Sequence, residues 1–163
     1  MKTLFILRHA KSSWSEPDLA DFDRPLNGRG TKAAPFMGKL MADMGYAPAI
    51  VLSSPAVRAK NTALLLKDAG GFDAELGFDD RIYEASPQGL RQVVAELDDE
   101  YTSAMLVGHN PGIEGFIRFL TARNESMPTA ALAVIELDID NWSEINDGRG
   151  ELNRIFRPKD EMK

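Results

Sequence analysis

The residues of this sequence best suited to chemistry are two histidines and two arginines, each placed shortly after a run of apolar residues. They are Arg8, His9, Arg58 and His109, and the chain has no other histidine. Arginine binds phosphate oxygens bidentately, and two arginines in one cleft repel each other unless an anion joins them. A neutral imidazole, with an ordinary pKa of about 6.5, can attack phosphorus. These residue types therefore indicate a phosphate pocket with a histidine nucleophile.

The apolar runs that precede these residues are typical of strands buried on both faces, because they are short, continuous and rich in Leu, Ile and Val. They are TLFIL (3–7), AIVLSS (49–54) and SAMLVG (103–108). We predict further strands over GFDDRIYE (77–84), ALAVIELDID (131–140) and ELNRIFRP (151–158), the last near an edge of the sheet.

Between the strands, apolar residues recur at helical spacing. The predicted helices cover 32–46, 55–71, 86–101 and 111–124. In the first of them, Pro35 suits the first turn and Gly45 the end, and Ser86 with Pro87 begins the third. Alternating strands and helices predict an α/β fold, a three-layer sandwich with a mostly parallel central sheet and helices on both faces. Ligands of such sheets bind beyond the carboxyl ends of the strands, where the four residues lie.

The composition sets wider limits on the function. A chain of 163 residues suits a single domain, 1–163, and its net charge of −6 argues against nucleic acid or an anionic membrane as a partner. The absence of cysteine excludes thiolate chemistry and cysteine zinc sites. The apolar run near the N-terminus is too short for a secretory signal, and no run approaches the ~20 residues of a membrane helix. We therefore expect a cytoplasmic protein.

Three motifs together resemble the histidine phosphatase superfamily, the phosphoglycerate mutase-like group that also contains acid phosphatases. They are LRHAKSSW with DFDRPLNGRG behind it, LSSPAVRAKNTA, and LVGHNPGIE, in the order and spacing of that family. The likeness spans residues 3 to about 120. It implies a phosphoglycerate mutase-like fold, a metal-independent reaction without a cofactor, and a phosphorylated His9. It also implies that Arg8 and Arg58 bind the phosphoryl oxygens, and that His109 completes the pocket.

Two features differ from most of the superfamily and resemble its short branch, the SixA-type phosphohistidine phosphatases. Ala10 stands where most of the superfamily has glycine, and only about 50 residues separate Arg58 from His109, which leaves no room for a helical cap. An open pocket can admit a phosphate carried by another protein. The expected substrate is therefore protein phosphohistidine, on a histidine phosphotransfer or phosphocarrier domain.

Two weaker candidates complete the predicted site. Glu84 lies between the second arginine and the second histidine, where ester-cleaving relatives carry a proton-donating acid; it can equally be a surface glutamate near a helix N-terminus. Ser12 lies close enough to His9 to bind a phosphate oxygen, although a turn or cap role is the more common one. Arg24 can order the first loop through Asp21 or Asp23.

Three other functions compete with this one. The protein can be a small-molecule phosphomonoesterase of the same superfamily, or a domain that binds a phosphorylated partner without turnover. A metal-dependent aspartyl phosphatase is the third, since DFD (21–23) and DID (138–140) each place two carboxylates two residues apart. The first pair does not follow an apolar strand, and few residues remain after the second. We therefore assign no metal ligands.

Overall fold

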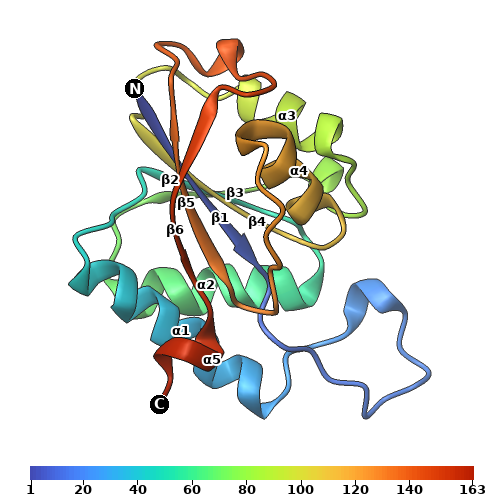
Figure 1. The fold of residues 1–163 in the computed structure, drawn as a ribbon. Helices are drawn as coiled ribbons and strands as arrows, with labels where there is room; N and C mark the ends of the chain where they lie inside the picture. Colours follow the sequence, from blue (N-terminus) through green and yellow to red (C-terminus); the bar gives the residue numbers. More distant parts are fainter.

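The computed structural model describes all 163 residues, and a single six-stranded sheet runs through its centre (Figure 1). The strand order is β3-β2-β4-β1-β5-β6. The strands are β1 (Lys2–Arg8), β2 (Ile50–Ser53), β3 (Glu75–Phe78), β4 (Ser103–Gly108), β5 (Leu132–Leu137) and β6 (Gly150–Phe156). The strands β3, β2, β4 and β1 pair in parallel, whereas the pairings of β1 with β5 and of β5 with β6 are antiparallel. The predicted mostly parallel sheet is confirmed, and β6 lies at an edge.

The central strands are apolar throughout because both faces of the sheet are covered. In β1, Leu4 and Ile6 belong to one buried cluster and Phe5 and Leu7 to the other. Alternate residues of a strand point to opposite faces, so a strand between two helical layers needs an apolar residue at every position.

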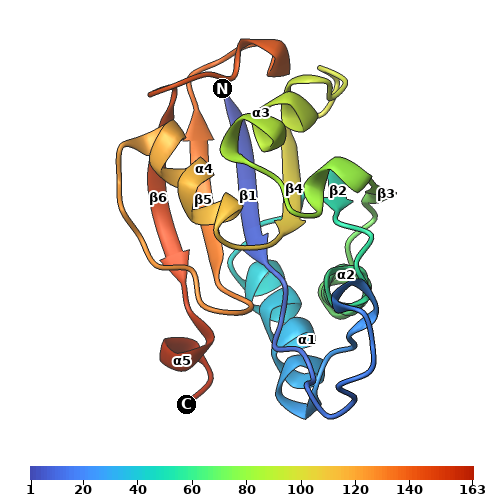
Figure 2. The same ribbon diagram turned by 90° about the vertical axis from the view of Figure 1, so that its right-hand side faces the viewer.

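Two helices cover each face. The helices α1 (Gly28–Asp43) and α2 (Val57–Gly70) contribute to the cluster with Phe5, and α3 (Pro87–Ala95) and α4 (Gly112–Thr121) to the cluster with Leu4. Figure 2 shows the two pairs on opposite sides of the sheet. A short helix, α5 (Pro158–Glu161), follows β6. The chain therefore has the predicted three-layer α/β arrangement. No helix has both the length and the apolar character needed to cross a membrane.

The first predicted helix begins earlier than expected. α1 starts at Gly28, where the Asn27 side chain accepts a hydrogen bond from the Gly30 N–H at 2.9 Å. Pro35 therefore lies inside the helix rather than in its first turn, and this prediction was wrong. The asparagine cap satisfies a free N–H of the first turn and fixes the helix start. The helix ends where predicted, because Gly45 adopts a left-handed conformation after the last turn.

The predicted strand over 77–84 is wrong for most of its length. β3 ends at Phe78, and a 3-10 helix, η2, covers Asp80–Ile82. The Asp79 carboxylate accepts a hydrogen bond from the backbone N–H of Arg81 at 2.9 Å, which favours a turn over an extended chain. Glu84 follows in a left-handed conformation, at φ 56°. The turn delivers Tyr83 and Glu84 to the carboxyl edge of the sheet.

Candidate active site

The strand register brings both histidines to one edge of the sheet. Arg8 pairs with Gly108 at the ends of the parallel strands β1 and β4, so His9 and His109 leave the sheet side by side. The His9 N–H donates to the Gly108 carbonyl at 3.0 Å, and the two imidazole centroids lie 5.1 Å apart. On the other side of β4, the Ser54 N–H donates to the Val107 carbonyl at 3.0 Å. Three adjacent strand ends thus form the floor of the site, as the sequence predicted.

His9 is held in the form that a nucleophile needs. Its Nδ1 lies 2.7 Å from the Ala10 carbonyl oxygen, which can only accept, so Nδ1 carries the proton and Nε2 keeps its lone pair. The pKa of His9 is lowered to about 4, chiefly by burial and further by the positive charges of Arg58, Arg8 and Arg24. The imidazole is therefore neutral at pH 7.

A second contact ties the loop after His9 to the helix that carries Arg58. The Ala10 N–H donates to Thr62 Oγ1 at 2.9 Å, and the same hydroxyl donates to the Arg58 carbonyl at 2.7 Å. Thr62 is fully buried. It fixes the start of α2 against the His9 loop, and with it the approach of Arg58 to the histidines.

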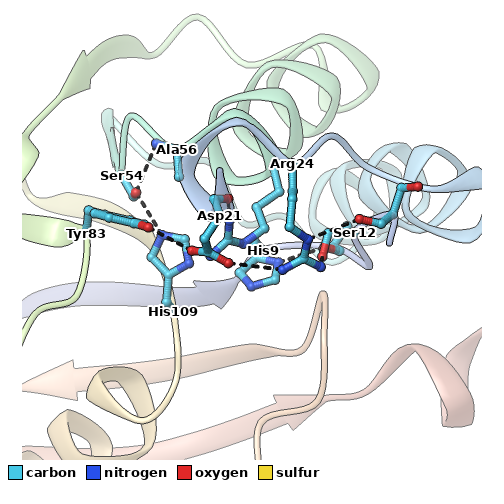
Figure 3. A network of polar contacts seen from close by, with 11 residues as sticks. His9, Ser12, Asp21, Arg24, Ser54, Ala56, Tyr83 and His109 are labelled. Carbon is cyan, nitrogen blue, oxygen red and sulfur yellow. Dashed lines mark hydrogen bonds and ion pairs between the residues drawn. The ribbon is translucent and has the colours of Figure 1, made fainter. Parts of the chain in front are cut away.

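The Asp21 carboxylate forms an ion pair with the guanidinium group of Arg58. Its Oδ2 accepts from Arg58 Nη2 at 2.9 Å and from the Tyr83 hydroxyl at 2.7 Å, and its Oδ1 accepts from Arg24 Nη1 at 3.1 Å. These hydrogen bonds, that of Tyr83 first, lower the pKa of Asp21 to about 2. Figure 3 shows Asp21, with its hydrogen bond from Tyr83, in the same cluster of side chains as His9 and His109. A carboxylate thus lies among the cationic and histidine side chains predicted to bind phosphate.

His109 and Arg8 each present a buried polar atom that has no partner. Serine 54 accepts a hydrogen bond from the Ala56 N–H and lies 2.8 Å from His109 Nε2, whereas His109 Nδ1 is unpaired. Arg8 donates from Nη1 to the Met127 carbonyl at 3.1 Å, and its Nε is unpaired. These two atoms are the only buried side-chain nitrogens or oxygens in the chain without a partner. Such atoms are costly when they have no partner.

The same environment keeps His109 neutral. Its pKa is lowered to about 3, mainly by burial and also by His9, Arg58 and Arg8, while Asp21 acts in the opposite direction. Burial also lowers the pKa of Arg8, with Arg58 adding to the effect. The site therefore concentrates positive charge on the arginines, where an anion would relieve their repulsion.

The remaining predicted residues lie around this centre. Glu84 is exposed and lines a cavity of about 390 Å³ together with Asp21, Arg58, Tyr83 and His109. Arg8 and His9 are not part of that lining, and His9 is only 6% exposed. The hydroxyl of the buried Ser12 accepts a hydrogen bond from Arg24. The interpretation of Arg24 as a residue that orders the first loop through Asp21 agrees with its contacts.

The two carboxylate pairs considered as metal ligands do not assemble a metal site. Asp21 is surrounded by hydrogen-bond donors rather than by further carboxylates. No group of three or more His, Cys, Asp or Glu side chains in the chain is arranged to hold a metal ion. The DFD segment instead forms a short 3-10 helix, η1 (Asp21–Asp23), that carries Asp21 to the arginines.

The sequence model of the histidine phosphatase superfamily, branch 1, matches residues 4–107. This chain belongs to that superfamily. An uncharacterized protein of Mycobacterium tuberculosis is 31% identical over 165 residues, 94% of this chain and 100% of its own length. An inferred phosphohistidine phosphatase SixA from Agrobacterium tumefaciens has 30% identity and a TM-score of 0.83, over 96% of this chain and 98% of that one. A protein histidine phosphatase SixA complexed with tungstate has the same fold, at 20% identity and a TM-score of 0.85, over 98% and 99% of the chains.

The structure brings Arg8, His9, Arg58 and His109 close together at one edge of the sheet, but the sequence interpretation missed several of their neighbours. Asp21 was considered only as a metal ligand or as a partner of Arg24, and Tyr83, Ser54 and Thr62 were not considered at all. Ser54 could have been found, because it follows β2 as His9 follows β1. No sequence signal indicates that Tyr83 reaches Asp21, which lies 62 residues earlier.

We expect both imidazoles to remain neutral at about pH 5.5, where a histidine with an ordinary pKa would be mostly protonated. Nitrogen-15 NMR of imidazole-labelled protein measures this directly and should show His9 protonated at Nδ1 only. The unfolded chain binds these protons near pH 6.5, whereas folded His9 binds its proton only near 4. The free energy of unfolding should therefore fall as the pH is lowered through that window. An imidazolium signal from His9 at pH 6 would contradict this geometry.

Asp21→Asn should tighten the binding of inorganic phosphate or tungstate. A bound dianion must replace the Asp21 carboxylate as the partner of Arg58, and it is repelled by the negative charge of that carboxylate. Asparagine carries no charge and therefore weakens both effects. We expect a decrease in Kd of about three- to tenfold, or about 1 kcal/mol, by isothermal titration calorimetry. Asp23→Asn, which removes a neighbouring charge without a contact to Arg58, is the matched control. Weaker binding in Asp21→Asn would show that the carboxylate instead positions Arg58 for the anion.

Proposed function

We propose that this protein is a metal-independent phosphatase that forms a phosphohistidine on His9 and hydrolyses protein phosphohistidine. The observation that carries the proposal is a neutral His9 whose proton is held on Nδ1 by the Ala10 carbonyl, with its imidazole centroid 5.1 Å from that of His109 and with Arg8 and Arg58 near enough to lower its pKa. Arginine side chains suit the binding of a phosphoryl group, and a neutral imidazole can attack it.

The first step transfers the phosphoryl group to His9. The Nε2 lone pair attacks phosphorus as the bond to the leaving nitrogen or oxygen breaks, and the leaving group takes a proton. The Ala10 carbonyl keeps its hydrogen bond from Nδ1–H and stabilises the positive charge that develops on the ring. Arg8, Arg58 and His109 stabilise the charge on the transferring oxygens.

The second step restores the enzyme. Water attacks the phosphorus of the phosphorylated His9, the P–N bond breaks, and inorganic phosphate leaves with neutral His9 regenerated. When phosphate departs, the carbonyl and the carboxylate of Asp21 can again accept the hydrogen bonds from Arg58 that this structure shows.

Two features support this substrate class: the short connection between α2 and β4, and the overall likeness to SixA. Between α2 and β4 the chain forms only β3, η2 and α3, with connecting loops and no inserted helical subdomain. The likeness to the Agrobacterium protein, at 30% identity over nearly the whole chain, supports phosphohistidine. A small phosphomonoester is the second candidate, favoured by the position of Glu84 at the cavity.

The test compares substrates under one set of conditions. The protein is incubated with a phosphohistidine-bearing phosphotransfer domain, with free phosphohistidine and with p-nitrophenyl phosphate, and kcat/KM is measured for each. We expect the phosphorylated domain to be preferred by about a hundredfold or more, about 2.7 kcal/mol in transition-state binding. A preference for the monoester would reject the phosphohistidine assignment and favour the second candidate.

A further inference from the structure

A second cavity, of about 510 Å³, lies next to the predicted active site and is lined by positive charge. Its four charged lining residues are Lys11, Arg29, Lys32 and Lys159, and no acidic residue lines it. All four are exposed, and none of them takes part in an ion pair or a side-chain hydrogen bond within the chain. In a protein whose net charge is −6, a concentration of unpaired cations at one place is unexpected.

The cavity is built on the two segments that hold the nucleophile. Lys11 lies two residues after His9, and its carbonyl accepts a hydrogen bond from the Asn27 N–H at 2.9 Å, immediately before α1. The first turn of α1 also lies close to Lys11, because a Cβ on Gly30 would be 2.2 Å from the Lys11 carbonyl oxygen. On the other side, Thr129 precedes Ala130, whose N–H donates to the His9 carbonyl at 3.0 Å. The cavity therefore lies against the backbone that positions His9.

The cavity also faces the same end of the molecule as the active site. In Figure 2, the N-terminal half of α1 and the short helix α5 lie beyond the tip of β1, the strand that delivers Arg8 and His9. α1 carries Arg29 and Lys32, and α5 carries Lys159. A protein that presents a phosphoryl group to His9 would extend over this surface.

The chemistry of the lining suits a macromolecule better than a small anion. The four cationic side chains are exposed and flexible, so they lack the fixed, converging donors of a site for a single phosphate. Apolar groups of Pro128, Pro158 and Met162 lie among them, and Met162 is 40% exposed. Apolar contacts with a charged rim are typical of protein interfaces, where rim charges mainly accelerate association.

We propose that this cationic cavity is a docking surface for an acidic face of the phosphoprotein substrate. The proposal rests on the proposed phosphohistidine activity and adds the charge that the partner must carry beside its phosphorylated histidine. The cations attract that face locally although the two proteins repel each other overall, and they orient the phosphohistidine toward the cavity lined by Arg58 and His109.

The test reverses two cations of this cavity that do not line the cavity with Arg58 and His109. Lys32→Glu/Lys159→Glu should lower kcat/KM for an acidic, phosphohistidine-bearing phosphotransfer domain by about tenfold at low ionic strength. The loss should largely disappear at about 1 M salt, where charges are screened within ~3 Å. Hydrolysis of free phosphohistidine should change by less than about twofold, because it needs no docking surface. Lys39→Glu/Lys67→Glu is the matched control, with the same change in net charge on α1 and α2 outside the cavity.

Two results would overturn the docking surface: an equal loss in the control pair, which would indicate a general charge effect, or an unchanged kcat/KM in the cavity pair. Binding of the unphosphorylated acidic domain, measured by fluorescence anisotropy, separates this proposal from the proposed activity. If the wild-type protein binds that domain and the cavity pair binds it about tenfold more weakly, the surface stands even without turnover. If turnover occurs but wild-type and variant Kd values agree, the surface is rejected and the activity stands.

Discussion

His9→Ala is expected to abolish phosphatase activity, with a loss of at least about a thousandfold in kcat for every substrate. The variant removes the His9 Nε2 lone pair, which is free because the Ala10 carbonyl holds the ring proton on Nδ1. The Asp21 carboxylate is not free to replace it, because it is bound by three donors.

The decisive measurement for His9 is covalent labelling rather than rate alone. The wild-type protein, mixed briefly with a ³²P-labelled substrate and quenched in alkaline detergent, should retain a label that acid removes, as expected for a P–N bond. His9→Ala should retain none, whereas His109→Ala, which keeps the nucleophile, should label more slowly. A label that persists in His9→Ala would place the nucleophile elsewhere. Phosphate binding without any label in the wild-type protein would favour the non-catalytic domain.

The position of Arg8, His9, Arg58 and His109 could be predicted because the ends of the strands determine it. A short apolar run followed by a polar residue indicates where a strand leaves the sheet, and parallel neighbours leave at the same edge. The register of Arg8 with Gly108 and of Ser53 with Val107 then brings the following residues together. This part of the site requires only the order of the strands and their common direction.

The role of Asp21 could not be predicted, because it depends on a loop that returns to the sheet from outside. Asp21 meets Arg58 37 residues later and Tyr83 62 residues later, through contacts that no local pattern encodes. The wrong strand over 77–84 has a related cause. A strand does begin this segment, but the Asp79 cap turns the chain after Phe78 and moves Tyr83 toward Asp21.

Glu84 combines an unusual backbone conformation with a place at the cavity. At φ 56° the residue occupies the left-handed region, which costs a non-glycine residue of order 1 kcal/mol and which glycine adopts freely. The exposed carboxylate makes no hydrogen bond within the chain and lines the cavity with Arg58 and His109. We therefore propose Glu84 as the proton donor to an ester leaving group.

Glu84→Gln should therefore reduce ester hydrolysis by about 10² to 10⁴-fold and reduce phosphohistidine hydrolysis by much less. An alkoxide must be protonated as it leaves, whereas a departing imidazole can take a proton from solvent on its outer nitrogen. The measurement compares kcat/KM for an alkyl phosphate, whose leaving group is poorer than that of p-nitrophenyl phosphate, with kcat/KM for phosphohistidine. Asp80→Asn, which removes an exposed charge four residues earlier, should change neither value. An equal loss on both substrates would make Glu84 a binding residue rather than an acid.

Glu84→Gly separates the chemical role of this residue from a structural one. Glycine relieves the left-handed backbone, so the free energy of unfolding should stay equal or rise by a few tenths of a kcal/mol, about the size seen when backbone strain is removed. Ester hydrolysis should nevertheless fall as far as in Glu84→Gln, because both variants lack the acid. A stable Glu84→Gly variant that still cleaves the alkyl phosphate at the wild-type rate would show that the carboxyl group donates no proton. The strained turn would then serve only to carry Tyr83 to Asp21.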